Sequence, residues 1–136
     1  MPGATIPVFS RRAFNFDDVQ APGAVEITMI KTIDVTQYTE GTLLVRVHAN
    51  DIGPDAKIEV IASATAPAGD DPERDFVGST VVTATIDAAV AAPALIRASF
   101  ATDPGEMVTI TVRGSQTSSA PTSCAAELSA ELVVKS

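Results

Sequence analysis

The stretch Gly41-Thr-Leu-Leu-Val-Arg-Val-His-Ala-Asn50 decides the fold class, because it is the most regular alternating segment of the chain. Successive side chains of an extended strand point to opposite faces. One face of this strand is apolar and the other is polar: Leu43, Val45, Val47 and Ala49 against Arg46, His48 and Asn50. The sequence therefore predicts the central strand of a sheet that has one face in a core and the other face against water or a partner.

Other segments repeat this two-residue period or are rich in β-branched residues, which favour strands. Together with 41–50 they predict seven or eight strands, at residues 25–33, 57–64, 76–82, 83–87, 94–100, 106–113 and 126–135, with 76–82 and 83–87 forming one strand or two. No segment has the pattern of an amphipathic helix. The chain is therefore predicted to be all-β, a two-sheet antiparallel β-sandwich. Eight strands favour a jelly roll over an immunoglobulin arrangement, whose Cys and Trp landmarks are missing.

The strands at 41–50 and 57–64 are separated by a turn at residues 51–55, Asp-Ile-Gly-Pro-Asp. Strand 57–64 places Ile58, Val60, Ala62 and Ala64 on one face. Because the connection is short, we expect these two strands to pair as an antiparallel hairpin.

Residues 1–23 are predicted to form an extended N-terminal arm that precedes a β-sandwich domain at 24–136. Three prolines interrupt this segment, and it carries three of the five phenylalanines. Its candidate interaction residues are Phe9, Arg11, Arg12, Phe14 and Phe16. Two interpretations are open: the arm covers the chain's own sandwich, or it reaches a neighbouring subunit.

Composition and charge limit the kinds of partner that this chain could bind. Its 136 residues are a length typical of one domain. Apolar residues make up 46% and aromatic residues only 4%, so the core must consist mainly of Val, Ile, Leu and Ala. The net charge of -8 disfavours binding to nucleic acid or to anionic membranes. The N-terminus has neither the basic nor the apolar region of a signal peptide, and no run approaches the roughly 18 apolar residues of a membrane span. We expect a protein made in the cytoplasm.

The sequence offers few groups for catalysis. His48 is the single histidine and Cys124 the single cysteine, so no disulfide can form within one chain, and these two are the only soft ligands available for zinc. We interpret His48 as a hydrogen-bonded or surface histidine, the alternative being a ligand or general base. We interpret Cys124 as an incidental thiol. The chain is expected to be no enzyme and to have no catalytic, cofactor-binding or metal-binding residues.

Two binding hypotheses remain open beside this expectation. Residues 70–75, Asp-Asp-Pro-Glu-Arg-Asp, could supply oxygen ligands for calcium, although Pro72 interrupts the acidic run and Arg74 supplies a counter-charge. A carbohydrate site would use exposed aromatic faces, but the chain has no Trp and one tyrosine, Tyr38. A solvated loop and a tyrosine that caps a strand are the simpler interpretations.

The segment Thr32-Ile-Asp-Val-Thr-Gln-Tyr38, which leads into Leu43-Leu-Val-Arg-Val-His48, resembles the start of a core strand in small jelly-roll accessory domains. With its proline-punctuated arm and acidic composition, the chain is similar to the small structural proteins of tailed-phage particles, such as capsid decoration and accessory proteins. The likeness is one of architecture and composition, and it transfers no functional residue.

This resemblance implies a non-enzymatic virion structural protein of a bacteriophage, made in the host cytoplasm, that forms a homo-oligomer and binds a capsid or other virion protein. The alternative is a carbohydrate-binding or cell-surface recognition β-sandwich module, which calcium could assist.

Overall fold

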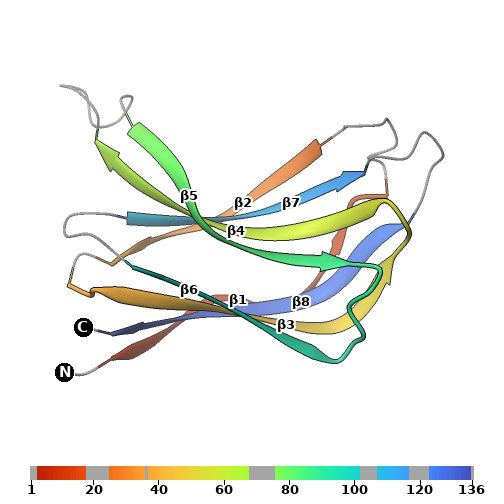
Figure 1. Cartoon of the computed structure of the whole chain (residues 1–136), viewed down its shortest axis with the longest axis horizontal. Helices are drawn as coiled ribbons and strands as arrows, with labels where there is room; N and C mark the ends of the chain where they lie inside the picture. Colours follow the sequence, from red (N-terminus) through yellow and green to blue (C-terminus); the bar gives the residue numbers. More distant parts are fainter. Residues whose placement is uncertain are drawn as a thin grey trace.

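Eight strands lie in the part of the chain that the computed structural model describes, which is residues 3–17, 25–35, 37–67, 76–101, 107–116 and 123–135. They are β1 (Ala4–Asn15), β2 (Val25–Asp34), β3 (Glu40–Ile52), β4 (Ala56–Pro67), β5 (Phe76–Asp87), β6 (Ala94–Ala101), β7 (Met107–Gln116) and β8 (Cys124–Lys135). They form two antiparallel sheets that stack face to face (Figure 1). Within these ranges no helix is long and apolar enough to cross a membrane.

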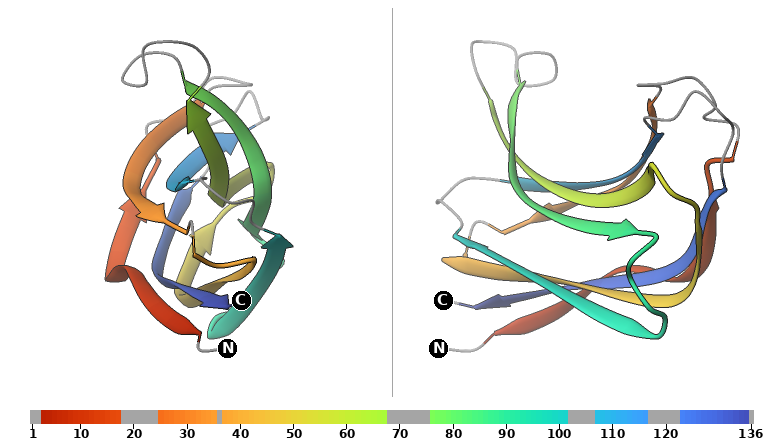
Figure 2. Two further views of the ribbon diagram at one scale, coloured as in Figure 1. Left: turned by 90° about the vertical axis from the view of Figure 1, so that its left-hand side faces the viewer. Right: turned by 45° about the vertical axis from the view of Figure 1, so that its right-hand side comes forward.

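The strand order within the sheets is that of a jelly roll. One sheet has the order β1-β8-β3-β6 and the other has the order β2-β7-β4-β5. Only β4 and β5 are neighbours both along the chain and within a sheet, so every other connection crosses from one sheet to the other. β1 and β2 lie on one side of the sandwich, and β5 and β6 lie on the opposite side (Figure 2). The predicted all-β sandwich of about eight strands is confirmed.

The predicted hairpin between residues 41–50 and 57–64 is wrong. β3 pairs with β6 and β8, whereas β4 pairs with β5 and β7 in the other sheet. The short connection carries the chain across the sandwich through a turn in which Asp55 has a positive φ of 67°. Connection length restricted how far apart the two strands could lie, but it did not determine whether they hydrogen-bond to each other.

Residues 4–15 of the expected N-terminal arm form a strand of the sandwich itself. They form β1, which pairs with β8 from Ala4 opposite Val134 to Asn15 opposite Ala125. Pro7 is tolerated because β1 is an edge strand and its register shifts directly after Pro7. The expected boundary at residue 23 falls outside the described residues.

The core lies between the two sheets and is built largely of aliphatic side chains that alternate along the strands. Val45, Ile58, Ile110 and Leu128 are each fully buried. The two-residue period predicted for 106–113 and 126–135 is confirmed, because buried side chains alternate with partly exposed ones along most of β7 and β8. Ala49, however, is exposed, because the register between β3 and β8 shifts after Val47 and ends the alternation there. The side chain of Ala64 lies outside the described part.

Candidate interaction surface

Half-buried and exposed side chains of several chemical kinds lie on the outer face of the β1-β8-β3-β6 sheet. Leu44, Arg46 and His48 of β3 point to this face, because Leu43, Val45 and Val47 are buried beneath it. Ser129 and Glu131 of β8 lie beside them, with Ser129 opposite Arg46 and Glu131 opposite Leu44. We call this face the outer β3–β8 face.

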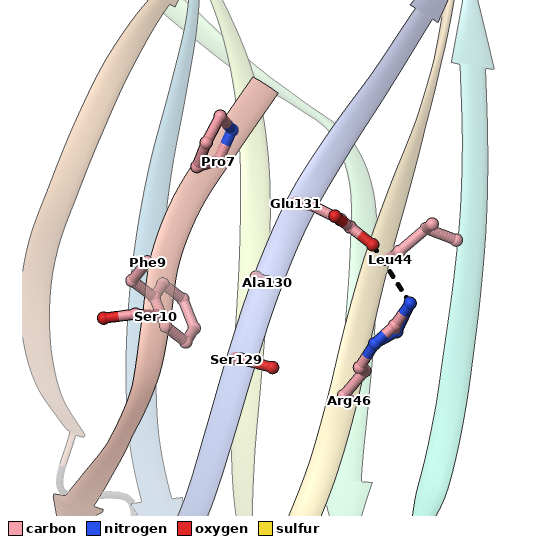
Figure 3. Close-up of a pocket in the computed structure, with 8 residues that line it drawn as sticks. All are labelled: Pro7, Phe9, Ser10, Leu44, Arg46, Ser129, Ala130 and Glu131. Atoms are coloured by element: carbon pink, nitrogen blue, oxygen red, sulfur yellow. Dashed lines mark hydrogen bonds and ion pairs between the residues drawn. The ribbon is translucent and has the colours of Figure 1, made fainter. Parts of the chain in front are cut away.

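A hollow of about 250 Å³ lies where β1, β8 and β3 run side by side (Figure 3). Its lining combines apolar and polar groups, among them Pro7, Ser10, Leu44, Arg46, Ser129 and Glu131. Arg46 Nη2 donates to Glu131 Oε1 at 3.1 Å across the hollow's β3 side. Both side chains remain partly exposed, so this ion pair stays accessible to a partner.

A second hollow of about 360 Å³ lies over β3 and the start of β6, and Arg46 lines both hollows. Its lining includes His48, Pro93 and Leu95. Leu95 is 42% exposed, one of two large apolar side chains of the described residues that are markedly exposed. An apolar side chain bordered by charged groups fits the pattern of a protein-binding surface, in which an apolar core is surrounded by a polar rim.

His48 is held in place rather than free. Its Nε2 lies 2.8 Å from Ser129 Oγ in a hydrogen bond across β3 and β8. The interpretation of a hydrogen-bonded histidine on the polar face is therefore confirmed. In the described ranges, no group of three or more His, Cys, Asp or Glu side chains could hold a metal ion.

An ion pair between Arg11 of β1 and Glu127 of β8 extends the charged part of this face. The hydrogen bond from Arg11 lowers the pKa of Glu127, although partial desolvation opposes it, and the charge of Arg11 and the nearby His48 act in the same direction as the hydrogen bond. The same hydrogen bond raises the pKa of Arg11. Both groups therefore stay charged over the physiological range.

The five candidate interaction residues of the N-terminal segment divide into two groups. Phe9, Phe14 and Phe16 are buried in the chain's own core, with the Phe9 and Phe14 ring centroids 5.2 Å apart. Arg11 and Arg12 are exposed, and the Arg12 guanidinium lies 4.5 Å from the centroid of the Phe14 ring. Of the five, only the two arginines have exposed side chains.

A third hollow, of about 280 Å³, lies beside the start of β4 and the end of β7, away from the outer β3–β8 face. It is lined in part by Lys57, Asp87 and Ser115. Cys124 lies close by, since its Sγ is 3.6 Å from the carbonyl oxygen of Lys57. Burial, with a smaller contribution from the charge of Asp17, raises the pKa of the Cys124 thiol and so disfavours the reactive thiolate.

Several residues of the surface were missed by sequence reasoning. Leu44 and Leu95 are apolar residues on a face that alternation predicts to be polar. An apolar residue at such a position was the one feature of the sequence that could have indicated the surface. Glu131 and Ser129 join the surface only because β8 lies next to β3. Residues 70–75, the candidate calcium loop, lie outside the described residues. Tyr38 is half-buried.

No protein-family model and no curated protein matches this sequence. Among solved structures, the chain is similar to a chain in the structure of infectious bursal disease virus, Gx strain, with 15% identity and a TM-score of 0.53. The match covers 98% of this chain and 32% of that chain, so this chain spans about a third of its neighbour. At this identity the likeness shows the fold alone.

A weaker match is the Clostridium thermocellum endo-1,4-beta-D-xylanase 10B, whose CBM22-1 and GH10 modules were solved with xylohexaose. Identity is 11% and the TM-score is 0.40, over 98% of this chain and 26% of that chain. A TM-score this low carries no argument about function.

Proposed function

We propose that the chain is a non-enzymatic structural protein of a virus particle, of the capsid decoration or accessory class in tailed phages, that self-associates and binds a particle surface. The observation that carries the proposal is the jelly-roll strand order, which includes every described strand from β1 to β8. This arrangement recurs in viral capsid proteins and lectins. The likeness in fold to a chain in the structure of infectious bursal disease virus is compatible with a role in a virus particle.

The outer β3–β8 face is the surface that we assign to particle binding. It combines an accessible ion pair, Arg46 with Glu131, and two half-buried or exposed leucines, Leu44 and Leu95. A capsid protein that buries the leucines and meets the ion pair at the rim would fit this distribution. The partner is therefore expected to offer an apolar patch bordered by charges of both signs.

The test is co-purification with particles, using two matched variants. Leu44→Lys places a charge in the first hollow, whereas Ile61→Lys places the same charge on the outer face of β4 in the other sheet, where Ile61 is also half-buried. We expect the wild-type chain and Ile61→Lys to sediment with particles from the virus that encodes the chain, and Leu44→Lys to bind at least ten-fold more weakly. Circular dichroism checks that both variants are folded.

Absence of the wild-type chain from purified particles would contradict the structural role. Equal binding by both lysine variants would contradict the assignment of the outer β3–β8 face. A glycan array, run with and without a calcium chelator, tests the carbohydrate-binding alternative. Binding to a glycan there, together with no binding to particles, would replace the proposal with that alternative.

A further inference from the structure

The two sheets leave four edge strands, and three of them are irregular or blocked. β1 has two register shifts, and Pro7 lies at the first of them. β2 has a register shift at Met29, and its Lys31 Nζ donates to the carbonyl oxygen of Pro7 at 2.8 Å. The ladder between β4 and β5 shifts after Ala62. Bulges, prolines and lysines are the usual means by which proteins prevent an edge strand from pairing with another chain.

β6 lacks these features. It pairs with β3 from Ala94 opposite Val47 to Ala101 opposite Glu40 without any register shift. The strand contains no proline and one charged residue, Arg97. Its other edge is not hydrogen-bonded to a strand in the described residues, because β5 belongs to the other sheet.

The side chains of β6 are also incompletely covered. None of its eight residues is buried, and the inward-facing ones, which include Ile96 and Phe100, are only half-buried. By contrast, inward-facing side chains of β8 in the same sheet, such as Leu128 and Leu132, are fully buried. The sandwich therefore ends at β6 with apolar surface that a further strand would cover.

We propose that two copies of the chain associate by antiparallel pairing of their β6 edges, with Ala98 of one copy opposite Ala98 of the second copy. The two β1-β8-β3-β6 sheets would then continue into each other across a two-fold axis. This proposal rests on the self-association included in the proposed function and specifies the surface that mediates it.

The register follows from the side chains of β6. Residues directly opposite each other in an antiparallel pair point to the same face, so inward residues must meet inward residues. A pair centred on Arg97 would place two arginines opposite each other. A pair centred on Ile96 would leave Phe100 without a strand residue of β6 opposite it. The pair centred on Ala98 avoids both problems.

With Ala98 at the centre, Ile96 of each copy lies opposite Phe100 of the second copy. An aromatic side chain opposite a β-branched one is a stabilising cross-strand pair. On the outer face, Arg97 lies opposite Ser99 of the second copy. The strand is thus complementary to itself, which favours a second copy as the occupant over an unrelated chain.

Charge at position 99 tests the pairing and its register. Ser99→Arg would place two arginine pairs across the interface, and Ser99→Glu would place two pairs of opposite charge there. Both variants lose the same hydrogen bond to Thr42 Oγ1, 3.0 Å in the native chain, so they are matched within the monomer. By analytical ultracentrifugation we expect Ser99→Arg to raise the dimer dissociation constant about five-fold and Ser99→Glu to lower it about five-fold.

Disulfide trapping locates the axis independently. Ala98→Cys is expected to form a cross-linked dimer under mild oxidation, because directly opposite residues of an antiparallel pair have Cα atoms about 4.5–5.5 Å apart, within the range of about 4.4–6.8 Å that a disulfide spans. Ala94→Cys is the matched control, since residue 94 is also a half-buried alanine on the same face of β6 but lies far from the axis. The natural Cys124 is 1% exposed and is present in both variants.

A wild-type chain that stays monomeric at millimolar concentration would overturn the proposal. Equal disulfide trapping at positions 94 and 98 would also overturn it. So would the same change in the dimer dissociation constant from Ser99→Arg and from Ser99→Glu. A wild-type chain that stays monomeric but still binds particles would overturn the self-association together with the β6 pairing, and would leave the particle-binding role in place. A chain that pairs through β6 but does not bind particles would overturn the proposed structural role alone.

Discussion

At the scale of single residues, an aromatic ring and a glycine explain why the N-terminal segment is part of the core. The ring of Phe16 occupies the space where a Cβ of Gly114 would lie. Gly114 faces inward between Val112 and Gln116, at a place where alternation predicts a larger side chain. Phe16, from the other end of the sequence, supplies that volume instead.

Gly114→Ala should therefore destabilise the chain, because the new methyl group overlaps the ring of a residue that is only 3% exposed. Overpacking of this kind costs about 1–3 kcal/mol in the free energy of unfolding. Urea denaturation measures the change. Gly41→Ala is the control: its Cβ would lie 2.8 Å from Cζ of the half-buried Phe100, so we expect a smaller loss. A larger loss at position 41 would contradict this account.

The Arg11–Glu127 pair predicts how stability depends on pH. Because Arg11 lowers the pKa of Glu127 in the folded chain, the folded state binds fewer protons at this site than the unfolded state. The stabilisation is fully present above the usual carboxyl pKa of about 4.3 and is lost as the pH falls through the lowered folded value. We expect Glu127→Gln to lose less stability between pH 7 and pH 3 than the wild-type chain.

Urea midpoints at the two pH values test this prediction. Arg11→Met should reduce the pH dependence as well, and the double variant should add nothing to either single change. Equal losses in the wild-type chain and in Glu127→Gln would show that the pair does not contribute to acid stability.

At the scale of elements, β8 and β6 have opposite roles in the same sheet. β8 lies between β1 and β3 and buries Leu128, Leu132 and Val134 completely. β6 lies at the edge and has no buried residue. The core therefore depends on a strand from the C-terminal end of the sequence, whereas β6 is available for contacts.

Matched leucine truncations measure this difference. Leu128→Ala should reduce the free energy of unfolding by about 2–5 kcal/mol, because it leaves a cavity between the sheets. Leu95→Ala, at a side chain that is 42% exposed, should change it by no more than about 0.5 kcal/mol. Thermal or urea unfolding of the purified variants, at concentrations where the chain is monomeric, gives both values. Similar losses from the two variants would contradict the assignment of β6 as a peripheral strand.

At the scale of the whole molecule, the first strand closes one side of the sandwich. Removing residues 1–17 would delete β1 with Phe9, Phe14 and Phe16, and would uncover the edge of β8. Burying each such side chain contributes about 1.5–3 kcal/mol, which together approaches the total stability of a small domain. We expect the truncated chain to lose cooperative unfolding by circular dichroism and to aggregate. A truncated chain that is soluble and unfolds cooperatively would show that β1 is a dispensable arm.

Alternation along single strands was sufficient to predict much of the fold. The inward faces of β3, β7 and β8 could be assigned from Val45, Ile110 and Leu132, because a strand with one buried face needs an apolar residue at every second position. The number of strands and the sandwich class followed from the same pattern. The limit appears at Ala49, where a register shift that depends on the neighbouring strand changes which face is buried.

The sequence by itself determined that this chain forms strands and which side chains of most of them face inward, because alternation is a local property of an extended backbone. Only the tertiary structure decided which strands pair. β3 and β4 are adjacent in sequence but lie in opposite sheets, and β1 and β8 come from opposite ends of the sequence but lie side by side. Backbone hydrogen bonds can join any two strands, so partner choice depends on how all eight strands together enclose one core. The outer β3–β8 face and the free edge of β6 exist only as consequences of that choice.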